Sequence, residues 1–137
     1  MASAADPVAQ LTRLAFLVQA ARERRAREQG VSPTLARLLE LLRDRAPTMN
    51  ELAALLGLDK SSTSGLVDRA QRRELVRRVP SQLDRRAVRV RLTTQGRDLD
   101  KSLSARFAAD IADLLEPMPE ADRRALADSL SALLGPR

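Results

Sequence analysis

The chain has no cysteine, no histidine, no tryptophan and no tyrosine, and only two of its 137 residues are phenylalanine. Without cysteine it can form no disulfide and has no thiol redox switch. Without histidine and cysteine it also lacks the commonest general base, the thiol nucleophile and the soft metal ligands. Phosphate-binding loops, dinucleotide-binding glycine patterns and serine-nucleophile motifs do not occur either. We therefore predict that the protein is not an enzyme, with no catalytic residue, no metal site and no cofactor.

Long apolar runs are absent as well. No stretch of 18 apolar residues occurs, so no membrane span is predicted. The first residues, MASAADP, lack a basic region followed by an apolar stretch, so we expect no secretory signal and a cytoplasmic location. A length of 137 residues suits one domain, and its 44% of apolar residues are enough for a core. That core is rich in alanine and leucine, which favour helix.

Two pairs of nearby carboxylates could in principle act as general acid and base. They are Asp98 with Asp100 and Asp110 with Asp113. Since acidic side chains are mostly exposed in folded proteins, we interpret all four as solvated surface charges.

Positive charge is concentrated in one segment. Residues 60–91 hold ten basic and three acidic residues, a net charge of +7, whereas the rest of the chain carries −1. Such a basic patch is typical of proteins that bind polyanions. The alternative is a general bias toward arginine, since the chain has 22 Arg and 2 Lys. A bias alone would spread the charge evenly, so nucleic acid is the favoured partner.

Helix-capping signals divide the first half of the chain. Asp6-Pro7 predicts a helix over 6–30, and Ser32-Pro33 a second one that ends before Pro47. Thr48 and Glu51 form a capping-box pattern, Gly57 suits a left-handed helix end, and Asp59 can cap the next helix. Two helices joined by so short a turn make a helix-turn-helix, although an ordinary pair of packed helices is the alternative.

The helix that begins at Lys60 has an unusual outer face. Its residues are small and hydroxylic at the start and basic toward the end: Ser61, Ser62, Ser64, Gly65, Asp68, Arg69 and Arg72. Small hydroxyl side chains can approach base edges, and arginine can hold phosphate or guanine.

A basic hairpin is predicted next. Two runs of alternating positions lie on either side of a Pro-Ser-Gln-Leu-Asp loop: Leu75, Arg77 and Val79 alternate with Val76 and Arg78, and Val88, Val90 and Leu92 with Arg89 and Arg91. Its positive residues include Arg85 and Arg86 near the tip, and Arg89 and Arg91 on the outward strand face. A helix-turn-helix followed by such a hairpin is a winged helix. We expect this arm to lie along a DNA backbone or in a minor groove, whose negative potential attracts arginine.

Three segments resemble the DNA-binding lobe of the MarR family of bacterial transcription regulators. They are ELAALLGLDKSSTSGLVDRA at 51–70, ELVRR at 74–78 and DRRAVRVRLTTQG at 84–96. The resemblance implies a mainly α fold for the single domain 1–137. A winged helix-turn-helix at 33–92 with a two-stranded β wing would be flanked by dimerisation helices at 6–30 and 93–135.

The resemblance also implies roles for particular residues. The helix starting at Lys60 would enter the major groove, and Arg86 would reach into the minor groove. Asp84 would help to hold the wing arginines. Relatives often carry a basic residue where Gly65 stands and glycine where Glu74 stands. Because a left-handed glutamate is strained, we expect the turn at Glu74 to differ locally from the family's turn.

The C-terminal part reads as two more helices. Thr93 can cap a long helix with an apolar stripe from Leu99 to Leu114, and the Pro117-Met-Pro119 break precedes a last helix rich in leucine. The stripes could form an intramolecular core, but a chain this short has limited capacity to bury long helices alone. We therefore favour a two-fold homodimer, the commonest oligomer.

Together these features predict a homodimeric, sequence-specific transcription regulator that acts as a repressor on a pseudo-palindromic operator. One alternative is a non-specific nucleoid or architectural DNA-binding protein. Another is a protein–protein adaptor, which the basic segment disfavours. The resemblance further implies a small-molecule effector that releases DNA. Phe16 and Phe107 are the candidates for lining its pocket, unless both are ordinary core residues.

Overall fold

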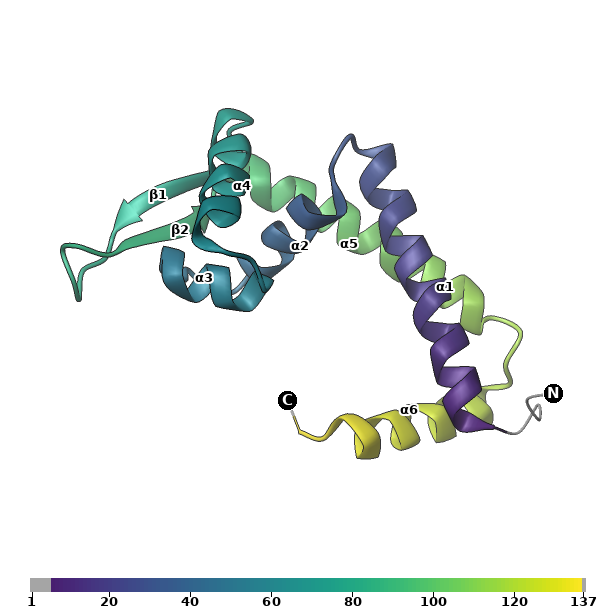
Figure 1. The fold of residues 1–137 in the computed structure, drawn as a ribbon. Helices are drawn as coiled ribbons and strands as arrows, with labels where there is room; N and C mark the ends of the chain where they lie inside the picture. The colour runs from purple at the N-terminus through teal and green to yellow at the C-terminus, as the bar shows by residue number, and fades with distance from the viewer. Residues whose placement is uncertain (1–5, 137) are drawn as a thin grey trace.

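A computed structural model describes residues 6–136, as six helices and one β-hairpin (Figure 1). The first five residues of MASAADP, on which the expectation of no secretory signal rests, lie outside this range. The elements run in the order α1 (Pro7–Glu28), α2 (Pro33–Leu41), α3 (Met49–Leu56), α4 (Lys60–Arg72), β1 (Val76–Pro80), β2 (Val88–Leu92), α5 (Thr94–Leu115) and α6 (Glu120–Leu134). The predicted fold class, a mainly α winged helix-turn-helix with a two-stranded wing, is confirmed.

The helices begin where the capping residues predict. The Thr48 hydroxyl accepts the Glu51 amide at 3.2 Å while the Glu51 carboxylate accepts the Thr48 amide at 3.0 Å, which completes the capping box of α3. Thr93 likewise accepts the Gly96 amide at 3.0 Å at the start of α5. Asp6, Ser32 and Asp59 cap α1, α2 and α4. At the end of α3, Gly57 takes the expected left-handed conformation, with φ 66°.

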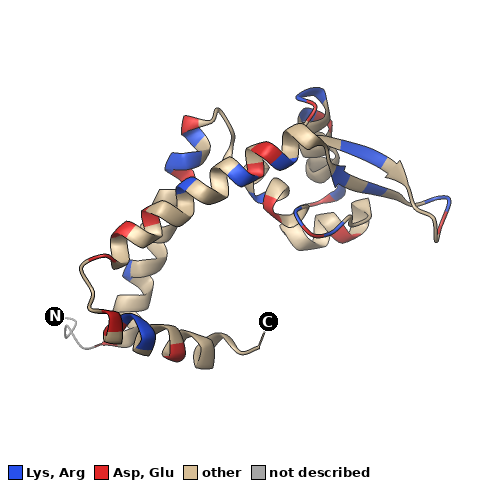
Figure 2. Cartoon of the chain, turned by 180° about the vertical axis from the view of Figure 1, so that it is seen from behind, with Lys and Arg blue, Asp and Glu red and all other residues tan. Residues whose placement is uncertain are grey.

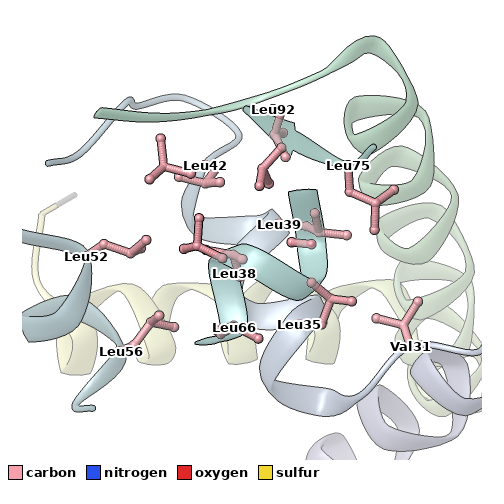
Figure 3. Close-up of a cluster of buried hydrophobic side chains, with 14 of the residues drawn as sticks. Val31, Leu35, Leu38, Leu39, Leu42, Leu52, Leu56, Leu66, Leu75 and Leu92 are labelled. Atoms are coloured by element: carbon pink, nitrogen blue, oxygen red, sulfur yellow. The ribbon is translucent and has the colours of Figure 1, made fainter. Parts of the chain in front are cut away.

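The core lies in the winged-helix lobe, where α2 runs through the middle (Figure 3). Leu38 and Leu39 of α2 are fully buried, as are Leu52 of α3 and Val67 of α4. Val90 of β2 closes the cluster from the wing side. The periodic apolar residues of these short helices therefore face one another, which is the packing that the sequence pattern requires.

The two long helices extend away from this lobe. Figure 1 shows α1 and α5 side by side, with α6 turning back across their far end. Along α5, Leu103 is buried next to the lobe, whereas Phe107 and Ile111 are half-buried and Leu114 is exposed. No residue of α6 is buried. The apolar stripes of the C-terminal helices are thus only partly covered within one chain.

A backbone junction joins α4, the wing and α5. Glu74 adopts a left-handed conformation, with φ 60°, so the expectation of a different turn at this position is wrong. Its carbonyl accepts the Thr93 hydroxyl at 2.5 Å, and the Leu75 carbonyl accepts the Thr93 amide at 3.1 Å. Gly96 is buried against the same Leu75 carbonyl, which a Cβ atom at this position would overlap. These contacts hold Glu74 in its strained conformation.

The interpretation of all four α5 carboxylates as solvated is wrong for two of them. Asp100 is only 3% exposed and accepts two hydrogen bonds from the Arg43 guanidinium, at 2.7 and 3.1 Å. Asp110 is bound by Arg25 at 2.7 Å, and this ion pair lowers the pKa of Asp110. Both carboxylates bind arginines that are far away in the sequence, so helical spacing alone does not reveal these ion pairs.

The Gly96 contact generates the first prediction. Gly96→Ala should lower the free energy of unfolding by about 2 kcal/mol, within the range typical of overpacking, because the new methyl group meets backbone rather than a movable side chain. Gly65→Ala is the matched control. At Gly65 a Cβ meets only the Arg69 guanidinium at 3.4 Å, so alanine should stabilise α4 by up to about 1 kcal/mol. Urea denaturation of both variants measures this, and equal effects would contradict the close approach at Gly96.

Candidate nucleic-acid interface

The first turns of α4 present an open polar surface. Thr63, Leu66 and Val67 face the core, which leaves Ser61 and Ser62 exposed and Ser64 and Gly65 half-exposed. The Asp59 carboxylate accepts the Ser62 amide at 2.6 Å, and this bond lowers the pKa of Asp59. The helix start is therefore firmly held, while its serine side chains remain accessible, as the sequence predicts.

Basic residues lie on the same helix as these serines. Lys60, Arg69 and Arg72 are all exposed. The Arg69 Nη1 atom lies 3.4 Å from the position that a Cβ on residue 65 would occupy. The missing side chain at Gly65 thus leaves room for the guanidinium of Arg69, which reaches back toward the helix start. Arg69, one turn later, therefore places positive charge next to residue 65.

Like charges face each other across the wing. In the antiparallel register Arg77 pairs with Arg91, and both side chains are exposed. Figure 2 shows blue segments along both strands of the hairpin. Like charges directly opposite one another destabilise a sheet, so this arrangement suits a surface that meets a polyanion. Arg77 was not among the residues predicted to bind DNA, because its position opposite Arg91 becomes visible only once the strand register is known.

Two wing arginines turn inward instead. Arg89 was expected on the outward strand face, but its Nη1 donates to the Ala46 carbonyl at 2.7 Å and its Nε donates to Ser81 Oγ at 3.3 Å. Arg78 binds Asp68 at 2.8 Å and Gln71 at 2.7 Å, both on α4. These contacts fix the wing to the helix-turn-helix. Arg89 is therefore a positioning residue of the wing, and of the two outward candidates on β2 only Arg91 projects freely.

The wing tip carries the predicted exposed arginines, Arg85 and Arg86. Asp84 lies next to them, and its Oδ1 accepts the backbone amide of Arg86 at 3.0 Å. Asp84 thus shapes the turn that presents Arg86, through the backbone and not through a guanidinium. Because Asp68 on α4 binds Arg78 of β1, the base of the wing lies next to the outer face of α4. The exposed serines and arginines of α4 and the exposed arginines of the wing therefore lie on neighbouring elements.

A separate cavity of about 700 Å³ lies between α1, α2 and α5. Phe107 lines it, and the Arg22 guanidinium lies 4.5 Å from the centre of the Phe107 ring. Arg22 also binds Glu40 at 2.6 Å. Phe16, the other candidate, does not line this cavity and is 74% exposed on α1. The structure places neither phenylalanine in the buried core.

Four arginines and two carboxylates surround this cavity: Arg22, Arg25, Arg37, Arg43, Glu40 and Asp100. The hydrogen bonds to Asp100 raise the pKa of Arg43, so this residue stays charged. The cavity wall thus has an excess of positive charge beside an aromatic ring.

Neither α5 nor any other helix in the described range is long and apolar enough to cross a membrane. Residues 6–136 also contain no cluster of acidic residues that could hold a metal ion.

A helix-turn-helix whose second helix leads directly into a basic β-hairpin defines a winged-helix protein. A model of the MarR family matches residues 29–87, from the end of α1 to the wing tip. The HTH-type transcriptional regulator YsmB of Bacillus subtilis (strain 168), itself uncharacterized, is 31% identical over 86 residues, which are 63% of this chain. The match spans 59% of the length of YsmB.

Solved structures extend the likeness to both flanking helical regions. RV1404 of Mycobacterium tuberculosis is 28% identical with a TM-score of 0.81, and the alignment covers 98% of this chain and 97% of that one. CouR of Rhodococcus jostii RHA1, whose structure holds p-coumaroyl-CoA, is 26% identical with a TM-score of 0.69. The alignment covers 96% of this chain and 94% of that one. Residues 29–87 thus match the MarR family, and the fold of almost the whole chain is similar to that of these solved structures.

The inward contacts of Arg89 generate the second prediction. Arg89→Ala should lower the free energy of unfolding by about 1 kcal/mol, because it removes charge-assisted hydrogen bonds to Ala46 and Ser81. Arg91→Ala, two residues along the same strand, is the matched control. It should change stability by less than about 0.5 kcal/mol, or raise it slightly by relieving the repulsion from Arg77. Thermal and urea unfolding compare the two, and an equal loss in both would refute the inward role of Arg89.

Proposed function

We propose that this protein is a sequence-specific DNA-binding transcription regulator that acts as a homodimeric repressor on a pseudo-palindromic operator. The observation that carries the proposal is that the exposed serines and arginines of α4 lie next to a wing that carries further exposed arginines. Small serine side chains lie where a helix in the major groove reads base edges, and exposed arginines surround them. We assign it no catalytic activity and place it in the cytoplasm with its DNA.

The competing function is non-specific binding, as in a nucleoid protein. A regulator should bind the DNA upstream of its own gene at least ~10³-fold more tightly than random DNA of equal length and composition. Fluorescence anisotropy at one fixed salt concentration measures both affinities, and fixed salt is necessary because phosphate contacts alone make binding salt-dependent. Equal affinities would favour the architectural function and contradict ours.

Dimerisation is supported by apolar side chains that one chain leaves uncovered. Exposed large apolar residues gather on the helices outside the winged-helix lobe: Val8, Leu11, Phe16 and Leu17 on α1, Leu114 on α5, and Leu133 and Leu134 on α6. Leu134 is 78% exposed, and α6 buries nothing within the chain. We assign these faces to a second copy, which would also bring Phe16 into an interface. A two-fold pair of α4 helices would then meet two half-sites about one helical turn apart.

The third prediction tests this dimer. Replacing Leu133 and Leu134 together by serine should yield a monomer and weaken operator binding by at least about a hundredfold, because two linked recognition helices are lost. Ser131→Ala, also exposed on α6, is the control and should leave the dimer intact. Light scattering gives the oligomeric state. A full-length chain that is monomeric yet binds the operator tightly would refute the proposal.

The fourth prediction concerns Arg86. Arg86→Ala should leave the melting temperature unchanged, because this side chain is exposed at the tip, but it should weaken operator binding. The loss should be greatest where the flanking DNA is A·T-rich, since a narrow minor groove strengthens the negative potential. Removing one phosphate-neutralising charge should also lower the slope of log affinity against log salt by about one. Salt titrations on two operators that differ only in their flanks measure both effects, and unchanged affinity on both would remove the wing tip from the interface.

We also propose that a small anionic effector regulates DNA binding from the cavity between α1, α2 and α5. The excess of arginine there and the ring of Phe107 favour an anion with an apolar or aromatic part. CouR, a family relative, binds p-coumaroyl-CoA. An anion that displaces Glu40 from Arg22 would disturb the contact between α1 and α2, and with it the position of the winged-helix lobe relative to the long helices.

A further inference from the structure

Leu83 at the wing tip is the most exposed large apolar residue in the described part of the chain, with 91% of its surface accessible. The other exposed large apolar residues lie on α1, α5 and α6, apart from Val88 at the start of β2. Figure 1 shows the wing projecting away from those long helices. A dimer that covers the helices therefore leaves Leu83 uncovered. Its exposure needs another explanation.

The backbone at this tip is held by hydrogen bonds. Ser81 is only 4% exposed, and its hydroxyl oxygen accepts the Leu83 amide at 3.3 Å. The same oxygen accepts Arg89 Nε at 3.3 Å, which ties the tip to the inward contacts of the wing. Asp84 then accepts the amide of Arg86 at 3.0 Å. The turn therefore presents Leu83 and Arg86 from one ordered loop, within three residues of each other.

We propose that Leu83 is an apolar contact in the minor groove of the operator, where it packs against the sugar walls and base edges beside Arg86. The proposal rests on the DNA-binding function proposed above and adds a residue that reads groove shape. The charges of Arg85 and Arg86 favour a narrow groove. The walls of that groove are deoxyribose rings, and proteins that bind there frequently use leucine and other apolar side chains. An apolar side chain among these charges gains contact area only after the tip has entered the groove.

Charge and apolar contact have different signatures in a salt titration. Leu83→Ala should weaken operator binding by about five- to tenfold, as expected for losing roughly half of a buried leucine side chain. The slope of log affinity against log salt should stay at the wild-type value, because no charge is removed. Arg86→Ala should instead lower that slope by about one. The neighbouring Gln82→Ala, also exposed, is the matched control and should bind like wild type.

The DNA itself provides a second, independent test. Replacing guanine by inosine beneath the wing removes the amino group that projects into the minor groove. This change should strengthen binding by the wild-type protein and have a smaller effect on Leu83→Ala, because the apolar contact is then missing. The operator is first mapped by footprinting on the DNA upstream of the gene, and both proteins are used as full-length chains.

The outcomes separate this inference from the proposed function. If wild type binds the operator specifically and Leu83→Ala binds equally well, Leu83 makes no contact and the inference is wrong. If Leu83→Ala changes the oligomeric state in light scattering without DNA, the residue belongs to a protein interface and the inference is also wrong. If wild type shows no preference for the operator over random DNA, it is the proposed function that fails. An unchanged melting temperature together with weaker binding and an unchanged salt slope is the supporting result.

Discussion

The close approach of Gly96 to the Leu75 carbonyl fixes the junction between α4, the wing and α5. It fixes the start of α5 against Leu75, the residue after the turn at Glu74. Thr93 adds two hydrogen bonds, to the carbonyls of Glu74 and Leu75. Because β2 ends at Leu92, directly before Thr93, the same junction also sets the base of the wing. The directions of α4, of the wing and of α5 thus depend on one site where only glycine fits.

The junction also explains why a glutamate can occupy a left-handed position. A non-glycine residue in this region carries strain of roughly 1 kcal/mol or more. Here the Glu74 carbonyl accepts the Thr93 hydroxyl, and the next amide, of Leu75, donates to the Ala70 carbonyl at 3.0 Å. The backbone is held from both sides, so the strain is tolerated without a change in the turn.

The arginines of the basic segment divide into two groups with different tasks. One group is bound within the protein and positions the wing and α4: Arg73 on the Gly30 carbonyl, Arg78 on Asp68, and Arg89 on the Ala46 carbonyl. The other group is exposed and remains available to a polyanion: Arg69, Arg72, Arg77, Arg85, Arg86 and Arg91. The net charge of the segment is therefore a guide to its partner, but only the structure separates the residues that build the surface from those that can contact the DNA.

The sequence predicts those parts of the fold that depend on interactions between residues close together in the chain. Caps such as Thr48 and Asp59 act on residues three positions away, and the hairpin alternates with period two, so their elements begin where expected. Arg43 and Asp100 are 57 residues apart, and neither the burial of Asp100 nor the inward turn of Arg89 has a local signature. The exposure of Phe16 likewise depends on what α1 packs against, which periodicity alone does not specify.

The central claim is that the serine face of α4 reads base edges. Its most direct test is the affinity of wild type and of Ser61→Ala, Ser62→Ala and Ser64→Ala for a complete set of single-base variants of the mapped operator. Since base contacts specify while phosphate contacts only position, each substitution should change the ranking of variants at the base pairs beneath α4 and leave the flanks under the wing unaffected. A ranking that is the same for wild type and all three variants would contradict direct readout by this face.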